Sequence, residues 1–154
     1  MRILGIDFGD SRTGAALSDP LGWTAQGLEV IRGGMDDTAA RVASVASEYK
    51  VGAIVVGYPL NMNGSAGFRA ERTDKFIGAL RREIDGSGGA NSAVEIIKWD
   101  ERLTSAEAAK VLKASGKRPT SRSVRETGKL DILSASILLQ SYLDHIGGSS
   151  RAGG

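Results

Sequence analysis

Apolar and polar positions along the chain follow two periods in turn, which predicts alternating strands and helices. Three apolar segments come first, at residues 3–9, 13–19 and 24–31. The links between them are short and rich in turn formers, so antiparallel hairpins are expected. Apolar residues then recur at helical spacing over residues 42–49, behind a cap expected at Asp36–Asp37. The first third of the chain is therefore predicted to form three strands and one helix.

The second half of the chain changes period several times. Residues 53–57 are continuously apolar, which is typical of a fully buried strand. Phe76, Leu80 and Ile84 recur every four residues and predict a second helix. The remaining predicted elements are a loop over residues 85–92, a strand over 94–99, a helix from the capping box Thr104–Glu107, a basic loop over 116–128 and a last helix over 130–143.

This order of elements predicts an α/β fold. Three antiparallel strands followed by α/β crossovers indicate a mixed five-stranded sheet with helices on both faces. The first strand is often central in such sheets, and ligands bind at the carboxyl ends of the parallel strands. We expect a single domain over residues 1–145 and a disordered Gly/Ser tail over 146–154.

Composition limits the chemistry that is available. The 154 residues include no cysteine, so disulfides and thiolate metal sites are excluded. No apolar run reaches the roughly 18 residues of a membrane span, and we expect a cytoplasmic protein without a membrane partner. Residues 98–129 carry nine basic and four acidic side chains, a net charge of +5, whereas the whole chain carries +2. This segment is either a solvated surface or an edge that binds a polyanion.

Acidic residues occur where the predicted strands end. Asp7 ends the first strand, Asp100 and Glu101 end the fifth, and Asp131 lies in the first turn of the last helix. Each has a structural explanation, such as pairing of Asp7 with Arg12 or attraction of Asp131 to the helix dipole. Together they could bring three carboxylates to one edge of the sheet, which is the oxygen-rich environment that Mg²⁺ requires.

Other chemistries have weaker support in the sequence. The one histidine, His145, is poorly placed for a Ser-His-Asp triad, and the nucleotide-binding patterns GxxxxGK[ST] and GxGxxG are absent. The segment Asn61-Met62-Asn63-Gly64-Ser65 follows a strand and precedes a helix. Its amides could therefore hold a phosphate, or its asparagines and glycine could simply form a turn.

Four motifs occur in a recognisable order: LGIDFGDSRTGAALSD, VVGYPLNMNGSAG, DERLTS and KLDILSASILLQSYLD. With these motifs, residues 1–144 resemble the YqgF/RuvX family of Holliday-junction-resolvase-like proteins and pre-16S rRNA nucleases, which has a ribonuclease H-like fold. The resemblance implies an endonuclease that uses Mg²⁺ or Mn²⁺ and hydrolyses phosphodiesters of structured nucleic acid, either an RNA precursor or branched DNA. The protein is expected to be a monomer or a homodimer, since a branched junction would favour a two-fold dimer and an rRNA-end nuclease could be a monomer.

The resemblance assigns residues to this function. Asp7, Glu101 and Asp131 match the acidic positions expected to bind metal and catalyse hydrolysis, with Asp100 as an alternative to Glu101. The residues expected to contact nucleic acid are Arg12, Asn61, Asn63, Arg102, Lys117, Arg118, Arg122 and Arg125.

The chain departs from related resolvases at one position. Those enzymes have an acid just after the fourth strand, where this chain has Gly57-Tyr58-Pro59-Leu60. The second carboxylate is therefore expected from Glu101 on the neighbouring strand, farther from Asp7.

Two further hypotheses stand beside the nuclease. One is a catalytically silent nucleic-acid-binding module of the same fold. The other is a sugar- or acetate-kinase-like ATPase, because IDFGDSRTG also resembles the phosphate-binding hairpin of those enzymes. They need two such domains around a cleft, and 154 residues provide only one.

Overall fold

A five-stranded mixed sheet forms the centre of the protein, as the computed structural model describes it for residues 1–87, 93–104 and 128–152. The strand order is β3-β2-β1-β4-β5, so β1 is central as expected. β1, β4 and β5 are parallel, and β2 and β3 are antiparallel to their neighbours. The strands are β1 (Ile3–Asp7), β2 (Arg12–Ser18), β3 (Ala25–Arg32), β4 (Ala53–Tyr58) and β5 (Glu95–Asp100).

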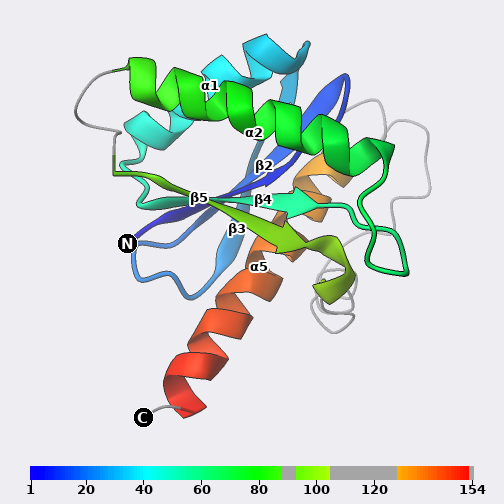
Figure 1. Cartoon of the computed structure of the whole chain (residues 1–154). Helices are drawn as coiled ribbons and strands as arrows, with labels where there is room; N and C mark the ends of the chain where they lie inside the picture. The colour runs from blue at the N-terminus through cyan, green and yellow to red at the C-terminus, as the bar shows by residue number, and fades with distance from the viewer. Residues whose placement is uncertain (88–92, 105–127, 153–154) are drawn as a thin grey trace.

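Helices cover both faces of this sheet (Figure 1). α1 (Met35–Glu48) and α2 (Phe68–Gly86) pack on one face, and α5 (Lys129–Ala152) crosses the other. A single 3₁₀ turn, η2 (Glu101–Leu103), follows β5. The predicted α/β architecture with a mixed five-stranded sheet and helices on both faces is confirmed.

Successive side chains of β1 point alternately to the two faces of the sheet. Leu4 and Ile6 are fully buried in the cluster beneath α1 and α2, whereas Ile3 packs with residues of α5. Asp7 lies four residues after Ile3 and therefore points to the α5 face. It ends β1 at the edge where β4 and β5 also end and where α5 begins.

Glycines let α5 approach the sheet closely. A Cβ atom on Gly5 would stand 2.7 Å from Cβ of Leu139, one on Gly14 would collide with the backbone oxygen of Asp131, and one on Gly27 would collide with Ile132. These glycines lie on the three strands β1, β2 and β3. Gly14 is also the register partner of Asp7, so the first turn of α5 lies directly beside the end of β1.

Several predicted boundaries differ from the structure. Gly34 precedes α1 without a side-chain cap, and Asp36 and Asp37 lie within its first turn, where the helix dipole favours acids. α2 continues to Gly86, past the predicted start of a loop at residue 85. α5 continues to Ala152, whereas the sequence predicts a disordered tail from residue 146.

Three predicted segments lie wholly or partly outside the described residues. They are the loop over 85–92 beyond residue 87, most of the helix expected from Thr104, and the basic loop over 116–128 apart from Gly128.

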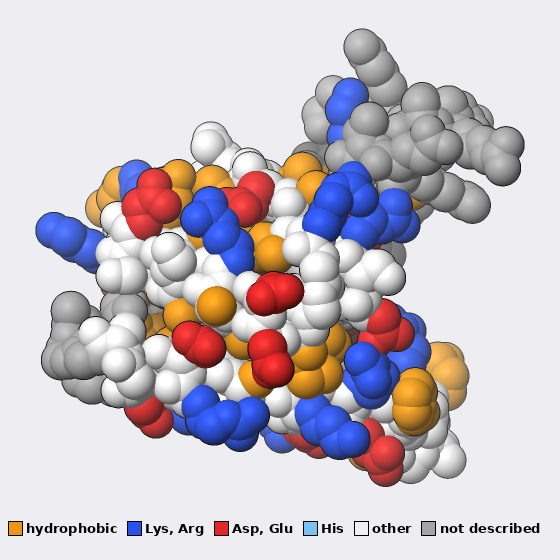
Figure 2. Space-filling view, turned by 90° about the horizontal axis from the view of Figure 1, so that it is seen from above, with side chains coloured by type: hydrophobic (Ala, Val, Ile, Leu, Met, Phe, Trp, Pro, Cys, Tyr) orange, Lys and Arg blue, Asp and Glu red, His pale blue; other side chains and the backbone are white. Residues whose placement is uncertain are grey.

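The surface over α1 and α2 carries acidic and basic side chains interspersed with one another (Figure 2). Such mixing is typical of a solvated surface rather than of one that binds a polyanion. Within the described part of the chain, no helix is both long enough and apolar enough to span a membrane.

Candidate active site

Three acidic side chains interact at the carboxyl edge of the sheet. Asp7 ends β1, Glu101 begins η2 directly after β5, and Asp131 lies in the first turn of α5. Burial raises the pKa of Asp7 to about 7, and the negative charges of Glu101 and Asp131 act in the same direction. The fold thus brings together the three carboxylates predicted from the sequence, which lie 94 and 30 positions apart along the chain.

Glu101, and not Asp100, joins this group. The Asp100 carboxylate accepts a hydrogen bond from the Arg102 amide at 2.9 Å and forms an ion pair with the Arg102 guanidinium at 2.8 Å. These bonds lower the pKa of Asp100 and keep its carboxylate charged. Burial, by contrast, raises the pKa of Glu101. The negative charge of Glu101 contributes to the raised pKa of Asp7, and no such contribution comes from Asp100.

Gly57 makes room for the Glu101 side chain. A Cβ on Gly57 would stand 2.8 Å from the Oε1 atom of Glu101 and would collide with Cδ1 of Leu138. Gly57 belongs to β4, which lies between β5 and β1. The Glu101 carboxylate therefore extends over β4, the strand between β5 and β1. This position directs it toward the central strand that Asp7 ends.

We expect Gly57→Ala to reduce activity more than stability. The added methyl group displaces Glu101 or Leu138 and costs about 1–3 kcal/mol of folding free energy, as overpacking usually does. Because small displacements of catalytic groups are costly, nuclease activity should fall by about 10- to 100-fold. Cleavage assays and thermal unfolding measure both effects. Gly78→Ala is the matched control, since its Cβ meets only Nη1 of Arg82 at 3.7 Å; equal activity of both variants would contradict the role of Gly57.

Arginines surround the acidic group. The Nε atom of Arg12 lies 3.5 Å from Oδ2 of Asp131, so Arg12 does have an acidic partner, but in α5 rather than in the adjoining turn. The positive charge of Arg69 partly offsets the rise that burial causes in the pKa of Asp7 and of Glu101. Sequence reasoning did not identify Arg69 or Arg72. Their spacing of three residues at the start of a helix was the available signal, because it places both on one face.

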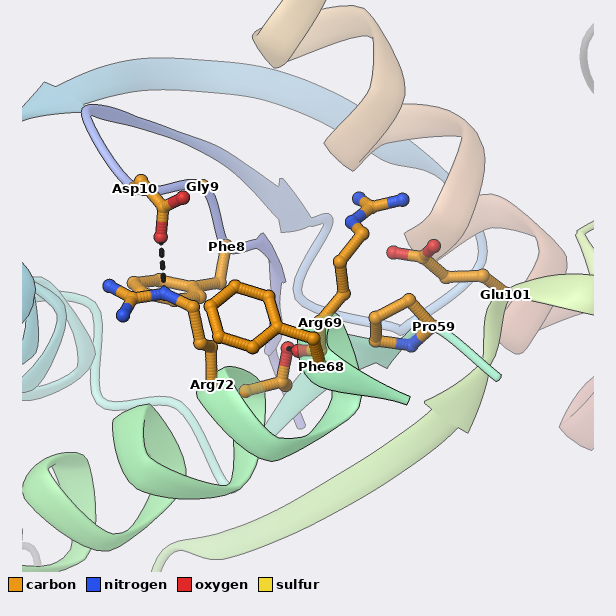
Figure 3. A pocket seen from close by; sticks show the side chains of 9 residues that line it. Phe8, Gly9, Asp10, Pro59, Phe68, Arg69, Arg72 and Glu101 are labelled. Carbon is orange, nitrogen blue, oxygen red and sulfur yellow. Dashed lines mark hydrogen bonds and ion pairs between the residues drawn. The ribbon is translucent and has the colours of Figure 1, made fainter. Parts of the chain in front are cut away.

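A pocket opens beside these residues, between the β1–β2 turn and the start of α2 (Figure 3). Its volume is about 190 Å³. Arg69 and Glu101 face each other at one end, and Arg72 forms an ion pair with Asp10 at the other. The exposed ring of Phe68 lies between the two ends. The pocket thus joins an acidic group to a surface that carries two arginines.

The other residues predicted to contact nucleic acid differ in what they contact within the protein. Arg102 is paired with Asp100 and approaches the carbonyl oxygen of Met62 at 3.5 Å. Asn61 donates to Oγ of Ser65 at 3.0 Å, and the side-chain oxygen of Asn63 accepts from the Ser65 amide at 3.0 Å. These bonds are those of a turn that closes on itself. Lys117, Arg118, Arg122 and Arg125 lie outside the described residues.

The acidic group fits a hard divalent cation by its chemistry. Its donors are carboxylate oxygens, which Mg²⁺ and Mn²⁺ prefer, and a cation would offset both the burial and the repulsion that raise the pKa of Asp7. Among the described residues, no three acidic or histidine side chains are already gathered as ligands. One of these carboxylates, Asp131, already pairs with a cation of the protein itself, Arg12.

A mixed sheet of this topology, with one acid at the end of its central strand and two more beside that edge, defines the ribonuclease H-like class of folds. The family RuvX, described as Holliday junction resolvase, matches residues 1–145, and the chain belongs to this family.

Relatives match the chain along its full length. A protein of Ruminiclostridium cellulolyticum named "Putative pre-16S rRNA nuclease" is 46% identical over 154 residues, which cover 99% of this chain and 100% of the relative. A protein of Pelotomaculum thermopropionicum with the same name is 46% identical over 157 residues, which cover 100% of this chain and 94% of the relative.

Solved structures share the fold at low sequence identity. T. thermophilus RuvC in complex with a Holliday junction substrate has a TM-score of 0.62 and 17% identity, with 96% of each chain covered. The Fowlpox virus resolvase in complex with Holliday junction DNA has a TM-score of 0.56 and 18% identity, with 95% of this chain and 99% of that chain covered.

Proposed function

We propose that this protein is a metal-dependent endonuclease that hydrolyses phosphodiesters of structured nucleic acid, in 5′ processing of pre-16S rRNA, in resolution of Holliday junctions, or in both. The observation that carries this proposal is the meeting of Asp7, Glu101 and Asp131 at one sheet edge, close enough for their charges to raise the pKa of Asp7. The names of the full-length relatives support the rRNA substrate, and the family description supports the junction.

In this proposal, Asp7, Glu101 and Asp131 would hold Mg²⁺ or Mn²⁺, which would supply Lewis-acid activation of water and stabilisation of the leaving oxygen. The protein's own groups set the conditions for binding. Asp7 must lose its proton, and Asp131 must exchange Arg12 for the metal, so Arg12 becomes available to a phosphate as the site fills.

The same proposal assigns the remaining predicted residues to substrate binding. Arg12 and Arg102 are proposed to contact phosphates near the acidic group, and Asn61 and Asn63 to shape the adjacent loop. The basic residues Lys117, Arg118, Arg122 and Arg125 are proposed to bind the nucleic-acid backbone through counterion release. A symmetric junction would favour a homodimer, whereas an rRNA end suits a monomer.

Side-by-side cleavage assays test the proposal. A four-way DNA junction and a pre-16S rRNA leader are each incubated with the protein in Mg²⁺, Mn²⁺ or EDTA. We expect cleavage of at least one substrate in either metal and none in EDTA, since the acids hydrolyse nothing without a cation. Asp131→Asn provides the matched inactive protein. Binding of both nucleic acids without any cleavage would instead identify the catalytically silent module, and cleavage in EDTA would contradict metal dependence.

A further inference from the structure

The arginines at the carboxyl edge differ in whether they form an ion pair with an acidic side chain. Arg12 pairs with Asp131, Arg72 pairs with Asp10, and Arg102 pairs with Asp100. Arg69, in contrast, forms no ion pair within 4.0 Å with any other residue that the structure describes. It still acts on two carboxylates at longer range, because its charge partly offsets the rise that burial causes in the pKa of Asp7 and of Glu101.

The position of Arg69 lets it serve two partners. It lies in the first turn of α2, and its guanidinium points across the mouth of the pocket toward the Glu101 carboxylate (Figure 3). Its side chain is exposed, and the pocket in front of it is open. A long side chain that no described residue holds in an ion pair can turn from the acids to the pocket without breaking such a pair.

We propose that Arg69 is the resident counter-cation of Asp7 and Glu101 and that it moves from these carboxylates to a substrate phosphate when divalent metal binds. This inference rests on the proposed function, because it requires the acids to be metal ligands. In the metal-free protein, the guanidinium of Arg69 supplies part of the positive charge that a divalent cation would bring to Asp7 and Glu101. When a cation occupies the acids, the two positive charges repel each other, and the phosphate brought by the substrate gives the guanidinium a new partner.

Arg69 therefore couples the two binding events. Without nucleic acid it competes with the metal and weakens metal binding. With nucleic acid present it is drawn away, so metal and substrate strengthen each other's binding by the same factor.

Mn²⁺ titrations without nucleic acid test the competition. Free Mn²⁺ is followed by electron paramagnetic resonance in the wild type, Arg69→Met, Arg69→Lys and Arg72→Met. We expect Arg69→Met to bind Mn²⁺ about threefold to tenfold more tightly than the wild type, because a competing charge is gone. Arg69→Lys retains the charge and should resemble the wild type. Arg72→Met is the matched control, since Arg72 is held by Asp10, and its Mn²⁺ affinity should change by less than about twofold.

A second titration tests the transfer to phosphate. Anisotropy of a labelled four-way DNA junction is measured in EDTA and in Ca²⁺, with intact substrate verified on gels. The gain in affinity from Ca²⁺ should be smaller by about threefold to tenfold in Arg69→Met than in the wild type.

The inference is overturned if Arg69→Met leaves Mn²⁺ affinity unchanged or weaker, if Arg72→Met tightens it equally, or if the gain from Ca²⁺ is unaffected. Failure of the proposed function gives a different result, namely an Mn²⁺ affinity that is unchanged when Asp7→Asn is introduced into each of these proteins. Thermal unfolding of each variant verifies that it is folded.

Discussion

Asp7→Asn should remove nuclease activity almost completely while the protein stays folded. The substitution preserves the shape of the side chain but replaces an anionic metal ligand by a neutral amide. Loss of groups that merely support metal ligands costs 10- to 100-fold, so loss of the central ligand should cost more than about 100-fold. Cleavage rates in Mn²⁺, compared with those of the exposed acid variant Asp36→Asn, measure this effect. Cleavage at the wild-type rate would exclude Asp7 from the site.

The same substitution should stabilise the metal-free protein above neutral pH. The pKa of Asp7 is about 7 in the folded protein against an ordinary value of 3.8. The folded state therefore binds a proton that the unfolded state releases, and the free energy of unfolding falls as pH rises from about 4 to about 7. Above pH 7 the full cost of the buried charge is present.

Thermal unfolding in EDTA across this pH range checks the sign. The wild type should lose stability between pH 4 and pH 7, by up to about 3 kcal/mol, and Asp7→Asn should lose less. At pH 8 the variant should be the more stable protein. A less stable variant at pH 8 would indicate that the Asp7 carboxylate is mainly a structural partner.

Gly14→Ala should cause the largest loss of stability among glycine substitutions beneath α5. Its new methyl group would meet the backbone oxygen of Asp131, and backbone cannot move aside as a flexible side chain can. The start of α5 must shift, at a cost of about 3 kcal/mol. The melting temperature should fall by roughly 5–10 °C, and activity should fall with it because Asp131 leaves its place beside Asp7.

Gly34→Ala is the matched control for this experiment, since a Cβ at Gly34 meets nothing within 4 Å. Its melting temperature should stay within about 2 °C of the wild type. If Gly14→Ala melted at the same temperature as Gly34→Ala and cleaved at the wild-type rate, the close approach of α5 would not determine the site.

Local patterns were sufficient to predict most of the fold. Short apolar runs with turn formers between them predicted the strands, since these features depend on neighbouring residues alone. Boundaries were less accurate where a helix end had no strong signal, as at Gly86 in α2 and at the start of α1. Acids at two strand ends and one helix start were also visible, because parallel strands bring their carboxyl ends to one edge.

The sequence by itself determined the mixed sheet, the central first strand and the edge at which Asp7, Glu101 and Asp131 gather. Only the tertiary structure decided that the charge of Glu101, rather than that of Asp100, acts on Asp7, and that Gly14 and Gly57 make room for this arrangement. It also decided which arginine meets which acid. These outcomes depend on contacts between elements far apart in the chain, and burial and charge at such contacts follow from the packing of α5 and α2 against the sheet.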